Sequence, residues 1–474
     1  MKKSKFWILL LLIIPCCFMF SACSFLEDDE KTPPKTYVTN ISKTTETENT
    51  DTYLITYSDN TTSTITIENG KDGLNGKDLT LEELKKYCEE NNTTLDDFIK
   101  EHLTVNYEGP FNSVSSATKK ALKSTVSVWC EIPTTSKTGM GCGAGVIYKM
   151  EETYSYIVTN FHVVYDTSCI TANNIASKIH VFTYGSQEGY YIKDSQIMYG
   201  YGAIECTYVG GAMNYDIAIL RAKTEDIKKF QPSACPVTIA SKYSVGDTAI
   251  AIGNPESIGT NVSSGIVSAY SENISLLSAD ATSTISHRVI RIDTPVNPGN
   301  SGGGLFNIEG NLIGIVVAKF ATDDVENIGY AIPCDKVAKV SENLMYYHKQ
   351  TGAVSQVKKI TLGITIQETN NRSEFVETAD GTEINLYNDA LITNIENNSL
   401  GYTMGLREND TVISATVIRD GQELSYTFKH SDEFVDLLLT IRAGDELRLK
   451  VVRNDITVTT TSQKITNDML TIIK

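Results

Sequence analysis

Positively charged residues are scarce in this sequence. Its 474 residues include 41 Lys and Arg against 58 Asp and Glu, so the formal net charge at pH 7 is −17. Nucleic acids and anionic lipids repel an acidic surface, so binding to either by overall charge is excluded. Peptides and proteins are the favoured partners. The length predicts two or three domains with linkers, since domains commonly contain roughly 100 to 200 residues.

The ten cysteines lack any C-x-x-C spacing. Structural zinc sites and dithiol redox sites use such closely paired cysteines, so we expect no metal, and we expect no organic cofactor either. Beyond the N-terminal region the cysteines are scattered and odd in number, which assigns no disulfide pairing. Most are expected to be small buried residues; they are Cys88, Cys130, Cys142, Cys169, Cys206, Cys235 and Cys334.

The apolar run at residues 6–20 is shorter than the roughly 18 residues that a membrane-spanning helix needs. Lysines precede it and small residues follow, which predicts a signal peptide over residues 1–22. The sequence Phe20-Ser21-Ala22-Cys23 resembles the lipobox of bacterial lipoproteins, which implies a diacylated Cys23. We therefore expect lipid anchoring on the extracytoplasmic, periplasmic or extracellular, face of a membrane. An uncleaved, tilted helix is the alternative.

Polar residues dominate positions 23–50, which predicts a disordered tether. Within 51–106, alternating β-branched runs at 53–57 and 63–67 predict a small hairpin. Apolar residues at helical spacing between 79 and 103 predict two short helices. This stalk segment could pack on the next domain, self-associate or do neither.

Long amphipathic helices are absent from residues 111–350 until about 333–347. Short β-rich runs separated by glycines and turn residues fill the rest, which predicts an all-β sandwich or barrel. After a polar linker, strands and short helices over 358–455 predict a compact α+β domain. Residues 456–474 are predicted to be a C-terminal tail.

The strongest local signal is Gly299-Asn300-Ser301-Gly302-Gly303. It places a hydroxyl nucleophile in a backbone that only small residues allow to turn so tightly. Glycines also let backbone amides converge, as acyl transfer requires around its developing oxyanion. Taken alone, the motif could be a surface turn without chemistry.

Two further blocks supply a base and an acid. His162 ends an apolar strand, and Asp216 directly precedes the apolar run 217–220. A carboxylate beside a buried strand is costly unless an imidazolium or hydrogen-bond donors receive it. Either residue alone would more often be structural. Their order with Ser301, however, is the His, Asp, Ser order of chymotrypsin and not that of subtilisin or the α/β-hydrolases.

The three blocks, 159–164, 215–220 and 298–305, are similar to the catalytic blocks of the high-temperature-requirement (HtrA, Deg-type) serine proteases. Supporting matches occur at 141–147, 253–255, 264–268 and 329–333. The resemblance implies a mainly β fold. Its parts are a chymotrypsin-like double six-stranded β-barrel protease domain and a small α+β PDZ domain, behind the lipoprotein signal and stalk.

The resemblance also implies roles for individual residues. His162 is the general base for Ser301, and Asp216 orients the imidazole. Gly299, Asn300 and Ser301 form the oxyanion turn, with the amides of Gly299 and Ser301 as donors. His180 and His287 are rival bases by composition, but they lie outside the matching blocks. We expect them to be surface or structural residues.

The resemblance places the primary specificity pocket at Val296, Val317, Ala318, Lys319 and Phe320. No acidic residue lies at its base, which predicts cleavage after small or medium apolar residues. Lys319 departs from the usual aliphatic pattern and could instead point to solvent.

The domain at 358–455 resembles a PDZ domain, and Leu362-Gly363-Ile364 corresponds to its carboxylate-binding loop. A bound C-terminal peptide would add as a strand beside Ile364, Thr365 and Ile366. Residues 368–388 exceed what that fold needs and predict a surface insertion. A domain that serves only as an oligomer or gating contact is the alternative.

Together these features predict a membrane-anchored serine endopeptidase that acts on misfolded or exported proteins and binds C-terminal peptides. Family members commonly trimerise, so a homotrimer is expected by resemblance alone. A non-cleaving envelope chaperone or scaffold, and a surface adhesin carrying a protease-like module, are the alternatives.

Overall fold

A computed structural model of the chain describes residues 38–46, 50–57, 62–68, 113–254, 259–317, 328–378 and 381–473. The chain divides into two compact units, residues 1–111 and 112–474. The predicted signal peptide, Cys23 and the helices predicted between 79 and 103 lie outside the described residues.

In the first unit, three antiparallel strands form one sheet: β1 (Val38–Glu46), β2 (Thr50–Tyr57) and β3 (Thr62–Glu68). β2 and β3 are the predicted hairpin. The prediction of a disordered tether over 23–50 is wrong for residues 38–46, which form β1. Its Val, Ile and Thr residues favour an extended backbone, and pairing with β2 supplies the hydrogen bonds that its sequence alone could not indicate.

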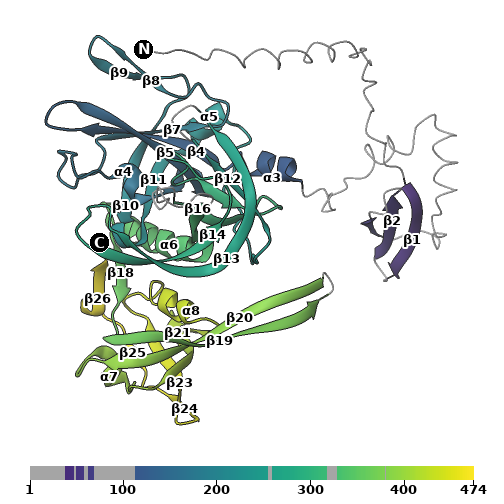
Figure 1. Ribbon diagram of the computed structural model, residues 1–474, viewed down its shortest axis with the longest axis vertical. Coiled ribbons are helices and arrows are strands. Elements are labelled where there is room, and N and C mark those ends of the chain that lie inside the picture. The colour runs from purple at the N-terminus through teal and green to yellow at the C-terminus, as the bar shows by residue number, and fades with distance from the viewer. Residues whose placement is uncertain are drawn as a thin grey trace, which may run out of the picture. The chain divides into compact units, whose positions relative to one another are not determined.

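The second unit opens with α3 (Val114–Ala121), followed by a closed six-stranded barrel (Figure 1). Its strands are, in order around the barrel, β10 (Ile204–Ala212), β11 (Ile217–Lys223), β6 (Tyr154–Thr159), β5 (Thr138–Met150), β4 (Thr125–Pro133) and β7 (Lys178–Thr183). A hairpin of β8 (Tyr190–Lys193) and β9 (Gln196–Tyr199) and the helix α5 (Thr224–Phe230) lie outside this closed ring.

A second closed barrel follows. Its strands are, in order, β12 (Thr248–Gly253), β13 (Asn261–Leu277), β14 (Thr284–Ile292), β17 (Gly329–Pro333), β16 (Leu312–Val316) and β15 (Gly304–Phe306). The predicted double six-stranded β-barrel is therefore confirmed. Closure removes the exposed strand edges that an open sheet would present.

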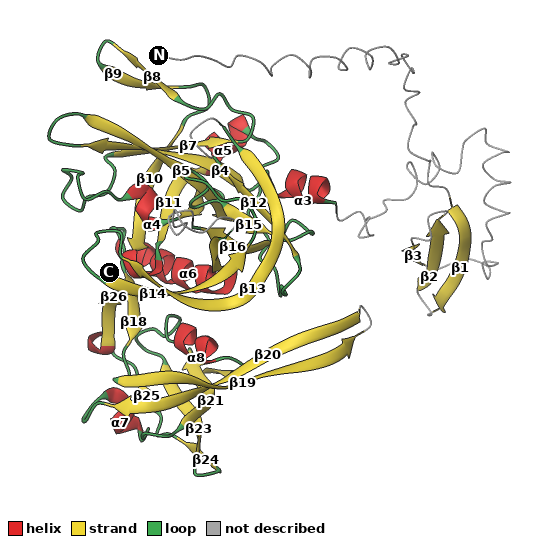
Figure 2. Cartoon of the chain, in the orientation of Figure 1, coloured by secondary structure: helices red, strands yellow, loops and turns green. Residues whose placement is uncertain are grey.

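The helix α6 (Cys334–Thr351) joins the two barrels. It packs against β10 and β11 of the first and against β16 and β17 of the second. Val337, Val340 and Leu344 recur at helical spacing and are buried in an apolar cluster shared by both barrels. Among the described residues strands dominate and α6 is the longest helix (Figure 2), as the sequence predicts.

The C-terminal domain is α+β, in agreement with its prediction. Its sheet runs β19 (Ile364–Thr378), β20 (Gly381–Ile395), β21 (Thr411–Arg419), β23 (Glu446–Arg453) and β24 (Ile456–Thr459), and β22 (Gln422–Thr427) and β25 (Gln463–Lys464) pair with β21 and β23. The helices α7 (Leu400–Met404) and α8 (Ser431–Leu437) complete it. The expected insertion forms the projecting end of the β19–β20 hairpin (Figure 1).

The prediction that residues 456–474 form a separate C-terminal tail needs correcting. β24 pairs with β23, and β26 (Leu470–Ile473) pairs with β18 (Val357–Ile360), so residues 456–473 belong to the domain. Isolated short strands carry little local signal, and here pairing with distant partners decides their structure. Among the described helices none is long and apolar enough to cross a membrane.

Candidate active site

The site begins at the ends of two neighbouring strands of the first barrel. β6 leads into the one-turn helix α4 (Phe161–Val164), which carries His162, and the 3-10 turn η1 (Met213–Tyr215) ends at Asp216 before β11. β6 and β11 pair directly. His162 Nδ1 lies 2.8 Å from Oδ2 and 3.0 Å from Oδ1 of Asp216, and the His162 backbone N–H donates to Oδ1 at 3.0 Å. One carboxylate thus fixes both the ring and the backbone of the histidine.

The backbone of Asp216 is in the left-handed region, with φ 51° and ψ 42°. That conformation is uncommon for a residue with a side chain and needs support from its surroundings. Buried Asn160 provides it, because its side-chain Nδ2 donates to the Asp216 carbonyl at 2.9 Å. The Asp216 N–H also donates to the Met213 carbonyl at 3.1 Å. These bonds hold the carboxylate against His162.

Ser301 lies in the turn between β14 and β15 of the second barrel, and its backbone is tied to the first. Its carbonyl accepts a hydrogen bond from the Ala144 N–H of β5 at 2.8 Å. Gly302 has φ +83°, and a Cβ there would lie 2.2 Å from Oγ1 of Thr159. Only glycine fits this approach. The nucleophile block therefore meets the strand end that leads into His162.

The turn around Ser301 is held by its own backbone. Asn300 N–H donates to the Asn297 carbonyl at 3.0 Å, and Gly303 N–H donates to the Asn300 carbonyl at 3.0 Å. Gly299 has φ +102°, which favours glycine. Asn300 thus uses its amide inside the turn. The predicted oxyanion donors are the amides of Gly299 and Ser301, and that role stays a prediction.

The described part of the predicted specificity pocket is apolar. Val317 is buried, and the side chain of Val296 packs on Gly329, where an added Cβ would lie 2.8 Å from Cγ2 of Val296. Ala318, Lys319 and Phe320 lie outside the described residues. Among the described pocket residues there is no carboxylate, as an apolar preference requires.

The two rival histidines differ in their distance from the site. His180 is on β7, and its ring centroid lies 3.9 Å from that of Tyr199. His287 is buried on β14, where Asp216 acts on its charge. Burial lowers the pKa of both imidazoles. The hydrogen bonds of the Asp216 carboxylate described above go to His162.

The predicted peptide-binding loop of the C-terminal domain is rigidly held. Gly363 has φ +66°, and a Cβ there would lie 2.4 Å from Cβ of Ser399. Its carbonyl accepts from Glu396 N–H at 2.8 Å, and the Leu362 carbonyl accepts from Gly401 N–H at 2.8 Å. Ile364 and Ile366 pack on the domain core. β19 is an edge strand of the sheet, and Thr365 lies on it.

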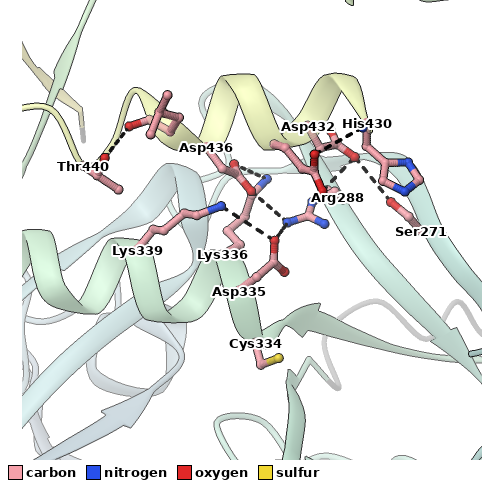
Figure 3. A network of polar contacts seen from close by, with 12 residues as sticks. Ser271, Arg288, Cys334, Asp335, Lys336, Lys339, His430, Asp432, Asp436 and Thr440 are labelled. Carbon is pink, nitrogen blue, oxygen red and sulfur yellow. Dashed lines mark hydrogen bonds and ion pairs between the residues drawn. The ribbon is translucent and has the colours of Figure 1, made fainter. Parts of the chain in front are cut away.

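A buried ion-pair network joins the second barrel to the C-terminal domain (Figure 3). Arg288 of β14 donates from Nη2 to Asp335 at 2.6 Å and to Asp436 at 2.7 Å, and its Nε lies 3.7 Å from Asp432. Asp432 and Asp436 are on α8, and Lys336 lies 3.6 Å from Asp436. Burial alone would lower the pKa of Arg288, but the nearby carboxylates of Asp436 and Asp335 raise it above its ordinary value.

A cavity of about 510 Å³ lies beside this network and is lined by both domains. Tyr270 and Arg288 contribute from the second barrel, and Glu368, His430 and Asp432 from the C-terminal domain. Glu368 lies on β19 and Asp432 on α8, and residues of β20 also line the cavity.

Among the described residues, no group of three or more His, Cys, Asp or Glu residues is placed to hold a metal ion. Cys130, Cys169, Cys206 and Cys334 are buried, as most cysteines were expected to be. Burial raises the pKa of the Cys334 thiol to about 12, so it is protonated at neutral pH.

Sequence reasoning missed several residues that hold this site. Asn160 was inside a recognised block without an assigned role. Glu188 lies in a polar segment without any motif, and Arg288 and Asp436 are 148 positions apart. Local patterns carry no signal for such partners, because the contacts exist only once the barrels close.

Residues 143–315 match the family described as the trypsin-like peptidase domain. The matched range contains His162, Asp216 and Ser301. The two closed barrels and this match together make the region similar to trypsin-like peptidases.

More specific likeness comes from individual proteins. The chain is 28% identical over 325 residues to the serine protease Do-like HtrA of Bacillus subtilis, which covers 67% of this chain and 62% of that protein. It is 33% identical over 209 residues to the protein of the same name from Lactococcus lactis, which covers 43% and 44%. The chain thus spans less than two thirds of these relatives. The resemblance to HtrA serine proteases is confirmed.

One similar solved structure is "HtrA-type protease AlgW with tripeptide". It is 22% identical, and the match covers 76% of this chain and 97% of that chain with a TM-score of 0.47.

Proposed function

We propose that this chain is a serine endopeptidase of the HtrA type. The observation that carries the proposal is the His162–Asp216 pair, with a 2.8 Å contact, at the barrel junction where a glycine turn presents Ser301. Similarity to proteins named serine protease Do-like HtrA supports the same activity.

In the proposed reaction, Nε2 of His162 takes the hydroxyl proton as Oγ of Ser301 attacks the peptide carbonyl. The imidazolium then returns that proton to the leaving amine, and a water molecule repeats the sequence to release the acyl group. Asp216 keeps Nδ1 protonated and stabilises the imidazolium. The amides of Gly299 and Ser301 donate to the oxyanion, an interaction that strengthens only as negative charge develops.

The proposed substrates are exposed segments of misfolded or exported proteins, cleaved after small or medium apolar residues. The apolar surfaces of Val296 and Val317 support that preference. The proposed role of the C-terminal domain is to bind C-terminal peptides. The rigid turn at Gly363 and the edge position of β19 support it, since strand addition uses an open sheet edge.

The proposed location is the extracytoplasmic face of a cell membrane, with the chain anchored through a lipid on Cys23. This follows from the lipobox resemblance. A homotrimer is proposed from the family resemblance alone.

The test is casein cleavage by the full chain purified in detergent, together with labelling by a fluorophosphonate probe. Cleavage and labelling that both disappear in Ser301→Ala would establish the nucleophile. Should the parent chain neither cleave nor label, even with apolar C-terminal peptides added, the non-cleaving chaperone or scaffold becomes the better account.

A further inference from the structure

Glu188 lies between β7 and β8, outside every motif recognised in the sequence. Backbone hydrogen bonds fix the chain on both sides of it. Gln187 N–H donates to the Tyr201 carbonyl at 3.1 Å, and Gly200 N–H donates to the Gly189 carbonyl at 2.9 Å. The Glu188 side chain is therefore presented from a fixed backbone.

The Glu188 carboxylate bridges the two barrels. Oε2 accepts from Oγ of Ser127 on β4 at 2.7 Å and from Nδ2 of Asn254 at 3.1 Å, and Oε1 accepts from Oγ1 of Thr260 at 3.1 Å. Asn254 and Thr260 lie between β12 and β13 of the second barrel. Burial raises the pKa of Glu188, while the hydroxyl donors act in the opposite direction. The charge is thus met by neutral donors from both barrels.

Asn254 carries this contact to the nucleophile turn. It is fully buried. Its side-chain Oδ1 accepts from Gly259 N–H at 2.9 Å, and its backbone N–H donates to the Gly299 carbonyl at 3.1 Å. Side chain and backbone of one residue therefore connect Glu188 to the oxyanion turn.

The Gly299 carbonyl is a sensitive point in that turn. A peptide unit is planar, so the fixed Gly299 carbonyl also fixes the Asn300 N–H, and this unit joins Gly299 to the residue before Ser301. Glycine has the softest backbone, and Gly299 at φ +102° has no Cβ to restrict rotation. A hydrogen bond to its carbonyl restricts the peptide unit that lies between those carrying the Gly299 and Ser301 amides, and so limits how far these two amides can turn apart.

We propose that Glu188 is a positioning residue, whose carboxylate acts through Asn254 to hold the Gly299 carbonyl and thereby the oxyanion donors in place. The proposal rests on the proposed endopeptidase function. Glu188 also links the two barrels, because Ser127 is in the barrel that carries His162 and Asn254 is in the barrel that carries Ser301.

The chemistry at this position calls for a carboxylate. Three donors converge on two acceptor oxygens, and Glu188→Gln replaces one of these oxygens with an NH₂ group of nearly the same size. The oxygen that remains is neutral, so the hydrogen bond from Nδ2 of Asn254 loses the strength that the carboxylate charge gives it. The variant therefore weakens the link while preserving shape.

The first experiment measures kcat and KM of Glu188→Gln on a peptide substrate, with active sites titrated. Glu225→Gln is the matched control, because Glu225 is exposed on α5 of the same barrel. Loss of an oxyanion donor itself lowers kcat about 10² to 10³-fold, and we expect about a 10-fold loss from misplaced donors. KM should stay within about twofold, since these donors act in the transition state.

A second readout does not depend on activity. Amide hydrogen exchange over residues 297–303 should be faster in Glu188→Gln than in the parent, with an unchanged thermal midpoint. If the parent cleaves nothing, the proposed function fails, and this exchange still decides the positioning role. If Glu188→Gln does not fold, Thr260→Val removes one donor to the same carboxylate and should show the same two effects at smaller size.

Unchanged kcat together with unchanged exchange would overturn the proposal. So would a kcat loss that merely follows the fraction of unfolded protein. A double-mutant cycle with Asn254→Ala should be non-additive in kcat, because both substitutions break one linkage.

Discussion

Arg288 of β14 and Asp436 of α8 lie 2.7 Å apart, from Nη2 to Oδ2, with both side chains almost fully buried. They belong to different domains. Because a buried charge is costly without its partner, this contact makes the packing of the C-terminal domain on the second barrel dependent on ion pairing.

Arg288→Met should destabilise the protein strongly. The substitution leaves Asp335 and Asp436 near one another without their shared guanidinium, and loss of one partner from a buried pair costs about 3–5 kcal/mol. Arg291→Met on the same strand is the control, because its pair with Glu272 is partly exposed and is worth about 0–1 kcal/mol. Urea unfolding measures both, and equal losses would contradict the prediction.

At pH 7, Asp432→Asn should stabilise the folded protein and Asp436→Asn should destabilise it. Burial raises the pKa of Asp432 above its ordinary value of 3.8, despite the attraction of Arg288 and Lys336. The folded state therefore holds the proton more tightly, so this contribution to stability is present below pH 3.8 and is lost as the pH rises through the folded pKa.

At pH 7 neutral Asp432→Asn should accordingly be more stable than the parent, and its advantage should shrink as the pH falls towards 4. Asp436→Asn at pH 7 should be less stable, since it removes a direct partner of Arg288. Unfolding free energies at pH 7, 5 and 4 check both. Destabilisation by Asp432→Asn at pH 7 would show that its ion pair outweighs its burial.

Asp216→Asn should lower kcat by about 10⁴-fold, because the amide favours the wrong imidazole tautomer while keeping the geometry. Its Oδ1 can still accept from the His162 backbone N–H, so the thermal midpoint should change little. Peptide hydrolysis and calorimetry are the two measurements. Retention of more than about a tenth of parental kcat would count against the assigned acid.

Gly363→Ala should weaken binding of apolar peptides with a free C-terminal carboxylate, raising Kd by at least about 10-fold. A Cβ at this left-handed position meets Ser399 at 2.4 Å and must shift the loop. Gly421→Ala is the control, because its φ is also positive but a Cβ there meets nothing within 4 Å. Fluorescence anisotropy with a labelled peptide compares them. Equal affinities would argue against this loop as the binding site.

Much of the fold followed from local patterns. Apolar and β-branched runs predicted the strands of the barrels, and the amphipathic pattern at about 333–347 predicted α6. The strand β1 and the C-terminal strands β24 and β26 escaped prediction. β1 is rich in polar residues, and β24 and β26 have only four residues each, so all three become strands through hydrogen bonds to partner strands, which local propensity does not report.

The sequence by itself determined the chemical groups of the site: a histidine at a strand end, an aspartate before a buried strand and a serine among glycines, in the order His, Asp, Ser. Tertiary structure alone decided what surrounds them. Asn160 supports the backbone of Asp216, Glu188 reaches Gly299 through Asn254, and Arg288 meets Asp436. These partners are joined by closing two barrels and packing a third domain on them, and barrel closure brings together residues that no periodicity along the chain relates.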